Sequence, residues 1–397
     1  MTYRSLLQNN KTFRLLAIVQ FISYFGAWFS QVGVFTLLTK ELQAPANIIG
    51  FSAIFIFLPS IILAPINGVI VDRFKPKNLL LTMISIEMIS IFMLIFINSL
   101  TMLWFLYFLT FVRMAVASMY FQTEMSVLPK ILTQQELKLG NELHSIIWAV
   151  SYALGMGVAG LFIDLFGVKP AFIADTLMLF CAILVLKTLI LPDEKNTTQN
   201  NLFILIKEGL TYIFSNKKII HLILLHGVVG ITAYDVLITL LAEYEYAKVI
   251  SIPLAIGFSN AIRAISLLIG PYVLSPYINK NTLVYLYLAQ GIGIMLWACL
   301  QFNFYLAFIG LVMAGFCTSS LWSYTYTLLQ NDCDKRYYGR VIAYNDMVYL
   351  TFSAIVAFST GYLFEFYGVK LSHFTFGLGV CFVFAAIYWW WFNKKYN

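Results

Sequence analysis

Long apolar runs alternate with short polar or Gly/Pro breaks along the chain, and this pattern predicts membrane-spanning helices. Each run is long enough to cross a hydrocarbon core of about 30 Å, which takes about 20 residues of helix. Six runs precede the most polar stretch of the chain and six follow it. We therefore predict an all-α membrane protein with twelve transmembrane helices in two pseudo-symmetric six-helix bundles. The predicted spans are 14–40, 47–71, 78–98, 100–125, 140–163, 168–190, 217–246, 249–275, 282–301, 303–328, 340–364 and 369–392.

A repeat supports the division into two similar halves. The segment at 160–169, Gly-Leu-Phe-Ile-Asp-Leu-Phe-Gly-Val-Lys, recurs at 361–370 as Gly-Tyr-Leu-Phe-Glu-Phe-Tyr-Gly-Val-Lys. Two such halves place a transport pathway at their interface, near the midplane of the bilayer. We predict an N-terminal bundle at 1–190, a linker with a short amphipathic segment at 191–216, and a C-terminal bundle at 217–397.

Composition excludes the soluble classes of protein. Hydrophobic residues make up 61% of the 397 residues and charged residues only 11%, against about 25% charged in an ordinary globular protein. The five cysteines and four histidines are dispersed, so we expect no metal site and no cofactor. The Gly-x-x-x-x-Gly-Lys-Ser/Thr phosphate loop is absent, which argues against ATP as the energy source. An enzyme acting on lipid would need clustered His, Asp or Glu at a membrane face, and the sequence shows no such cluster. The linker is too short to be a signalling domain. We therefore expect neither an enzyme nor a scaffold.

The net charge of +7 orients the chain in its lipid bilayer. Nineteen of the 25 lysines and arginines fall on one side of the predicted spans. Because positively charged loops stay on the cytoplasmic side, both termini are predicted to be cytoplasmic. The charge is therefore an orientation signal rather than a nucleic-acid footprint, and we expect a monomer in the inner membrane of a bacterium. The opposite side holds Lys40, Lys169, Lys248 and Lys370.

The loop between the second and third spans carries a motif, Gly-Val-Ile-Val-Asp-Arg-Phe-Lys-Pro-Lys at 68–77. A glycine lets a helix end pack closely, an acid there can pair with a neighbouring helix end, and the basic residues hold the loop on the cytoplasmic side. The motif resembles the signature of the major facilitator superfamily, and the resemblance covers essentially the whole chain. It implies that the halves are latched in the outward-facing state by Gly68, Asp72, Arg73, Lys77 and Glu124.

Further stretches point to a group within the superfamily. They lie at 23–30, 128–132, 140–141, 171–175 and 339–341. Their order and spacing are similar to the drug-efflux group that includes bacterial macrolide exporters and enterobactin-type siderophore exporters. The chain departs from the family pattern at three places, and the one in the span-five motif leaves import open. The second signature copy, after Gly270, lacks the acid–arginine pair, the span-five motif at 155–160 lacks its proline, and Ala27 stands where members often carry an acid.

Charged residues inside the predicted spans are functional candidates, because a charge in hydrocarbon is expensive. Glu87 and Arg113 lie at similar depths on consecutive spans, and Asp235 and Arg263 do so in the second half. Each couple could simply neutralise itself and fix helix packing, or it could bind a proton or a polar group of the substrate. The segment that ends in Arg113, Leu-Thr-Phe-Val-Arg, resembles the superfamily's span-four motif, which is associated with proton coupling. We predict Asp235 as the protonated acid.

Aromatic side chains make up 17% of the chain, and some lie on the spans that line the pathway in this fold. A cavity lined by such rings favours amphipathic, often aromatic solutes. The alternative is ordinary packing between helices. The candidates are Trp28, Trp148, Tyr234, Trp322, Tyr324 and Tyr326.

These features together predict a secondary active transporter. The leading hypothesis is an exporter that moves small hydrophobic or amphipathic molecules by proton antiport, with residues 1–190 rocking against residues 217–397. Its partners would be a small-molecule substrate, protons and the lipid bilayer. A dedicated siderophore or lipid exporter and a proton-coupled importer remain as alternatives.

Overall fold

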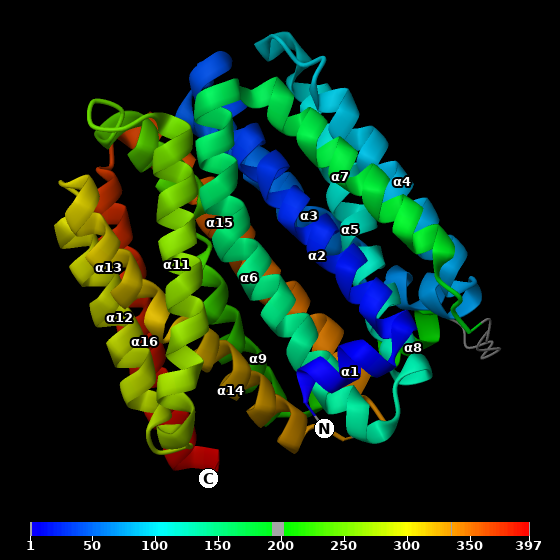
Figure 1. Cartoon of the computed structure of the whole chain (residues 1–397). Coiled ribbons are helices and arrows are strands. Elements are labelled where there is room, and N and C mark those ends of the chain that lie inside the picture. Colours follow the sequence, from blue (N-terminus) through cyan, green and yellow to red (C-terminus); the bar gives the residue numbers. More distant parts are fainter. Residues whose placement is uncertain (1, 193–201, 335, 397) are drawn as a thin grey trace. The chain divides into compact units, whose positions relative to one another are not determined.

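The computed structural model describes residues 2–192, 202–334 and 336–396, and it describes no side chains at 64, 65, 68, 69, 72 and 202–205. Every element longer than one turn within these ranges is a helix (Figure 1). Twelve helical segments of the described chain are long and apolar enough to cross a membrane. The all-α class and the twelve predicted spans are thus confirmed, with ends that move by a few residues.

The chain divides into two compact units, Met1–Gln43 with Ile62–Gln199 and Ala44–Ile61 with Asn200–Asn397. Helices that begin before residue 190 are α1 (Tyr3–Asn9), α2 (Lys11–Thr36), α3 (Ala46–Arg73), α4 (Pro76–Leu94), α5 (Leu103–Ile131), α6 (Gln134–Phe166) and α7 (Val168–Thr188). The later helices are α8 (Leu202–Ser215), α9 (Lys217–Val229), α10 (Asp235–Leu240), α11 (Ile252–Leu274), α12 (Leu283–Leu300), α13 (Phe304–Phe316), α14 (Thr318–Asp332), α15 (Tyr338–Tyr367) and α16 (Leu371–Tyr396).

Each unit has its own packed core. In the first unit, α2 packs against α6 and α7, and α4 packs against α5 and α7 (Figure 1). In the second unit, α12 packs against α13 and α16, and α9 packs against α14 and α15. Long apolar helices bury facing stripes in this way and leave other apolar faces exposed, as expected of helices that contact lipid.

The start of α3 belongs to the second unit, whereas the sequence boundaries assign the whole second span to the first bundle. The backbone N–H of Ala46 donates to Glu365 Oε2 at 3.0 Å. A Cβ on Gly50 would lie 2.9 Å from the carbonyl oxygen of Ala357. A Cβ on Gly361 would lie 3.1 Å from the Cα of Gly50. Small residues let the two helix backbones approach closely, which explains this grouping.

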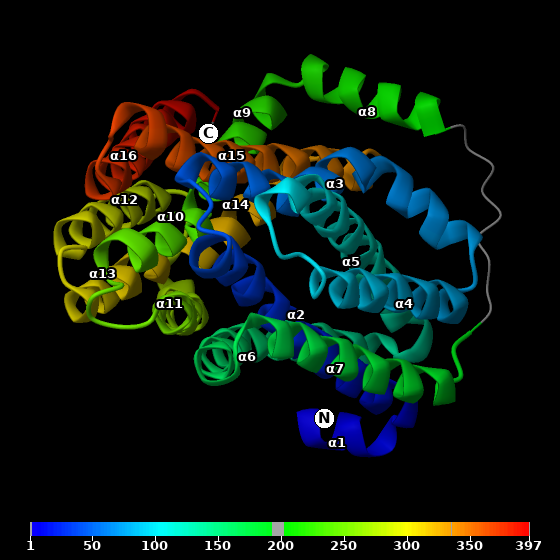
Figure 2. The ribbon, with the colours of Figure 1, turned by 90° about the horizontal axis from the view of Figure 1, so that it is seen from above.

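The seventh span is broken in the middle, where the hydrophobic pattern predicts one continuous helix. The helices α9 and α10 are labelled separately in Figure 2. Between them lie a short 3-10 turn at Gly230–Thr232 and two residues outside any helix, Ala233, with φ −76° and ψ 79°, and Tyr234. The break leaves carbonyl groups without helical partners inside the span, and such groups need other donors. One of these donors is described with the site below.

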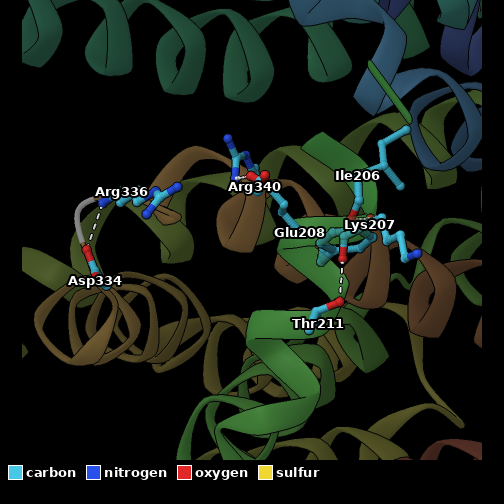
Figure 3. Close-up of polar contacts among 8 residues, drawn as sticks. Ile206, Lys207, Glu208, Thr211, Asp334, Arg336 and Arg340 are labelled. Atoms are coloured by element: carbon cyan, nitrogen blue, oxygen red, sulfur yellow. Dashed lines mark hydrogen bonds and ion pairs between the residues drawn. The ribbon is translucent and has the colours of Figure 1, made fainter. Parts of the chain in front are cut away.

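The amphipathic segment predicted at 203–214 forms α8, which is fastened to the start of α15 (Figure 3). Arg340 Nη1 lies 2.7 Å from Glu208 Oε2. The rings of Tyr212 and Tyr337 stack with centroids 4.4 Å apart. The hydroxyl of Tyr344 donates to the carbonyl of Ile206 at 3.1 Å. An ion pair, a ring stack and a hydrogen bond therefore hold this helix within the second unit.

Candidate functional site

A buried charged cluster lies inside the first unit, around Arg113 on α5. Arg113 Nε is 3.8 Å from Glu87 Oε1 on α4, and the two residues are 5% and 8% exposed. Arg113 Nη2 also donates to the carbonyl oxygen of Ala27 on α2 at 2.8 Å. One guanidinium thus joins three helices, and the structure brings together the couple that was predicted from depth along the spans.

Asp175 on α7 completes this arrangement, which we call the Arg113 cluster (Glu87, Arg113, Asp175 and Ser30). Asp175 is fully buried, and the hydroxyl of Ser30 donates to its Oδ2. Arg113 interacts electrostatically with the carboxyl groups of both Glu87 and Asp175. A Cβ on Gly26 would collide with the Asp175 carboxyl, so the glycine makes room for it. Asp175 belongs to the stretch at 171–175 that carries the family resemblance, and its place within a predicted span also marks it as a functional candidate.

Glu124 on α5 lies in the interior rather than at an exposed helix end. It is 1% exposed, and the hydroxyl of Tyr24 on α2 donates to its Oε2 at 3.3 Å. Of the predicted latch residues, Arg73 is exposed. Lys77 donates to the carbonyls of Lys187 and Leu189 at 2.8 Å and 2.6 Å, which satisfies the end of α7. Gly68 and the side chain of Asp72 lie outside the described residues.

His144, a histidine that the sequence did not single out, lies beside Tyr24, the residue that donates to Glu124. Gln20 Nε2 is 2.7 Å from His144 Nδ1 and 3.2 Å from the His144 carbonyl oxygen. A carbonyl oxygen only accepts, so the Gln20 atom is the amide nitrogen and His144 Nδ1 is an acceptor. The ring of Tyr24 meets that of His144 edge-on, with centroids 6.1 Å apart. A polar path of Gln20, Tyr24, Glu124 and His144 thus lines the interior of this unit.

The second-half couple has a different geometry from the first. Arg263 Nη2 donates to the carbonyl of Thr232 at 2.5 Å, at the break in the seventh span. The guanidinium carbon lies 4.9 Å from the centroid of the Tyr234 ring. Asp235 begins α10 directly after the break, and its side chain is half-buried. Arg263 thus bonds a carbonyl at the break that also accepts from the backbone N–H of Tyr234 at 3.0 Å. Asp235 and Arg263 both act electrostatically on Tyr349.

The predicted aromatic residues separate into core and partly exposed groups. Tyr234 is fully buried against Trp297, with ring centroids 4.9 Å apart, so it is a core residue and does not line a surface. Trp28 stacks on Tyr152 at 4.3 Å, and the edge of Trp148 approaches it at 6.3 Å. In the first unit these three rings form one aromatic group.

In the second unit, Trp322 and Tyr326 stack with centroids 5.0 Å apart, and Tyr324 is half-buried. His226 lies against both stacked rings. Within the described ranges, no group of three or more His, Cys, Asp or Glu residues is placed to hold a metal ion. The groups available for chemistry in these two regions are buried carboxyls, imidazoles and aromatic rings.

The twelve apolar segments found in the described ranges, with charged side chains buried between helices, define a multi-pass membrane protein. Residues 16–357 match the Major Facilitator Superfamily, so the chain belongs to this superfamily of membrane transporters. The predicted membership of the major facilitator superfamily is thereby confirmed.

The chain is similar to two uncharacterized MFS-type transporters of Bacillus subtilis (strain 168). It is 25% identical to YfiS over 217 residues, which are 53% of this chain and 51% of the relative. It is 21% identical to YkuC over 227 residues, which are 54% and 52% of the two chains. The chain spans about half the length of the curated relatives it matches.

Solved structures share the fold. The nucleoside transporter NupG superposes with a TM-score of 0.74 at 14% identity, covering 97% of this chain and 100% of that one. An auto-inhibited peptide transporter of the POT family superposes with a TM-score of 0.78 at 9% identity, covering 98% and 97%. At these identities the likeness is one of fold.

Proposed function

We propose that the protein is a proton-coupled secondary transporter that exports small hydrophobic or amphipathic molecules by antiport, with alternating access. The Arg113 cluster is the observation that carries this proposal. Its two carboxyl groups and one guanidinium are buried in a helix bundle that faces lipid, where an uncompensated charge is expensive. A cluster of this composition is electrically neutral when one carboxyl holds a proton.

The geometry supports proton exchange because the guanidinium contacts more than one helix. Arg113 reaches Glu87 on α4 and the carbonyl of Ala27 on α2. A shift of either helix changes the distance between the guanidinium and a carboxyl, and the proton affinity of the carboxyl follows that distance. Loading and release of one proton would then be linked to the conformational change that moves the substrate.

Export is favoured by the resemblance of the sequence to drug and siderophore exporters, which also leaves a dedicated siderophore or lipid exporter as an alternative. Import is the second candidate, because the span-five motif at 155–160 lacks its proline. Nucleoside and peptide transporters also share the fold. The excess of lysines and arginines on one side of the spans favours a bacterial inner membrane with both termini in the cytoplasm.

Flux in proteoliposomes under an imposed pH gradient tests the function and its direction. We would offer erythromycin, a catecholate siderophore, uridine and dialanine as substrates. Antiport predicts substrate uptake driven by an acidic lumen, whereas import with protons predicts uptake driven by an acidic exterior. Glu87→Gln should reduce the accumulation to the passive level, and Glu41→Gln, at an exposed position, should behave as wild type. Gradient-driven accumulation by Glu87→Gln would contradict the role of the cluster.

A further inference from the structure

We propose that the second unit contains a subsite for a protonated organic amine, formed by His226 on α9 and the rings of Trp322, Tyr326 and Tyr349. The acceptor nitrogen of His226 would accept a hydrogen bond from an N–H of the ammonium group, and the rings would contact the rest of the ligand. That such an amine is a transported substrate rests on the proposed function, whereas the binding site itself is tested separately.

The tautomer of His226 follows from its neighbour on α14. His226 Nδ1 is 2.8 Å from Thr325 Oγ1, and Thr325 Oγ1 is 2.7 Å from the carbonyl oxygen of Leu321. Two oxygens at that distance require a hydrogen between them, so the single hydroxyl hydrogen of Thr325 points to Leu321. Thr325 therefore accepts from His226, whose Nδ1 carries the proton. The other ring nitrogen, Nε2, is left as a bare acceptor.

The bare acceptor has no partner among the described residues. His226 is fully buried, and Nε2 has no hydrogen bond in that part of the chain. A buried polar atom without a partner is unfavourable, because it has lost its bond to water without gaining another. A ligand that donates an N–H to Nε2 removes this penalty, whereas a ligand without a donor does not.

Three aromatic rings surround the imidazole. The centroid distances from His226 are 5.7 Å to Trp322, 5.6 Å to Tyr326 and 5.6 Å to Tyr349. Trp322 is 39% exposed, so its indole is the side of the group that a ligand reaches first. Aromatic faces attract a desolvated cation as well as an apolar body. The rings therefore favour a ligand that combines a positive charge with a hydrocarbon part.

The charges near the rings favour a cation over an anion. Tyr349 interacts electrostatically with Asp235, Asp346 and Arg263, and Tyr326 interacts with Asp346. Among the described residues, two carboxyl groups and one guanidinium group act on these rings. Arg263 is already held by the carbonyl of Thr232 and by the Tyr234 ring. An ammonium group meets a net attraction at this place, and a carboxylate would meet a net repulsion.

The test compares two ligands that differ in the N–H donor. Binding of 4-phenylbutylammonium and of its N,N,N-trimethyl analogue is measured calorimetrically with the full chain in nanodiscs. The decisive variant is His226→Asn, because the asparagine amide can still donate to Thr325 while the Nε2 acceptor is removed. We expect it to weaken binding of the primary amine about tenfold or more, the usual weight of a hydrogen bond to a charged group. Binding of the trimethyl analogue should stay unchanged.

Two further variants keep the outcome decisive. Thr325→Val removes the group that sets the tautomer, and it should also reduce the preference for the primary amine. His373→Asn changes an exposed histidine and should leave both affinities unchanged. Thermal unfolding of each variant shows whether it is folded. If His226→Asn is unfolded, the ligand preference of Thr325→Val tests the subsite instead. Equal losses for both ligands, or no loss for the primary amine, would overturn the subsite.

The outcome is separable from that of the proposed function. If wild type shows the amine preference and its loss in His226→Asn but no flux under a pH gradient, the subsite stands and proton-coupled transport fails. If gradient-driven flux depends on Glu87 but the affinity for the amine is unchanged in His226→Asn, the proposed transport function is supported and the proposed subsite is contradicted.

Discussion

Arg113 donates a hydrogen bond to the backbone carbonyl of Ala27 at 2.8 Å, which ties α5 to α2 in the middle of the first unit. Ala27 is the position where the superfamily resemblance leads one to expect an acid. In this chain the position contributes only its main-chain oxygen to Arg113. The acids near Arg113 are instead Glu87 and Asp175, on two other helices.

Replacing Arg113 by methionine should destabilise the protein strongly. The substitution leaves Glu87 and Asp175 buried without their cation, and loss of one partner of a buried pair costs about 3–5 kcal/mol. We expect the double variant Glu87→Gln with Arg113→Met to unfold at a higher temperature than Arg113→Met alone. Thermal unfolding in detergent measures both. A double variant that is less stable than the single one would mean that the pair contributes little to the fold.

Asp235→Asn tests the acid predicted for the second half. The residue follows the break in the seventh span and is half-buried, so loss of its charge should leave the protein folded. We expect gradient-driven flux to be lost while exchange of substrate at equal pH is retained. The readout is the ratio of driven flux to exchange in proteoliposomes. Full driven flux in Asp235→Asn would assign coupling to the Arg113 cluster alone.

Glu124 and Tyr24 should contribute to transport as one coupled pair. Because Tyr24 donates to Glu124 at 3.3 Å, the effects of Glu124→Gln and Tyr24→Phe on transport rate should not add in the double variant. Arg73→Gln, at an exposed position, should combine additively with Glu124→Gln. Non-additivity between Glu124 and Arg73 would instead support the latch that the resemblance implies.

The contact between α8 and α15 depends more on the tyrosine stack than on the ion pair. Exposed ion pairs contribute about 0.2–1 kcal/mol, whereas an aromatic pair adds about 0.5–1.5 kcal/mol beyond its buried area. Tyr212→Ala should therefore raise hydrogen exchange in residues 206–215 more than Glu208→Gln does. Exchange followed by mass spectrometry checks this, and the reverse order would give the Arg340–Glu208 pair the larger role.

Gly361→Leu should disrupt the packing of α15 against the start of α3. A side chain at Gly361 collides with the backbone of Ala46 and approaches the Cα of Gly50, and overpacking costs about 1–3 kcal/mol or more. Gly377→Leu on α16 is the matched control, because nothing lies within 4 Å of a Cβ there. We expect a lower unfolding temperature for Gly361→Leu only. Equal unfolding temperatures would show that the helices shift apart freely.

The pair of opposite charge on α4 and α5 could be found from the sequence, and the contact between two neutral polar groups on α2 and α6 could not. Glu87 and Arg113 stand out because charges are rare in apolar helices, and their depths follow from counting residues along each helix. Gln20 and His144 are separated by more than 120 residues, and neither is unusual at its own position. Their contact depends on the rotation of α2 and α6 about their axes. The break after Val229 was also not predicted, because isolated glycines such as Gly227 and Gly230 within an apolar run do not by themselves end a helix.

By itself the sequence determined that the chain is a bundle of twelve apolar helices, because helix length and hydrocarbon thickness leave no other solution for runs of this kind. It also determined the superfamily and the couple on α4 and α5. Only the tertiary structure decided which carbonyl Arg113 and Arg263 each contact, that Tyr234 is a core residue, and that His226 Nε2 lies among three rings with no hydrogen-bond partner in the described part of the chain. These features depend on distances between side chains on different helices, and a one-dimensional pattern of apolar and polar residues contains no such distances.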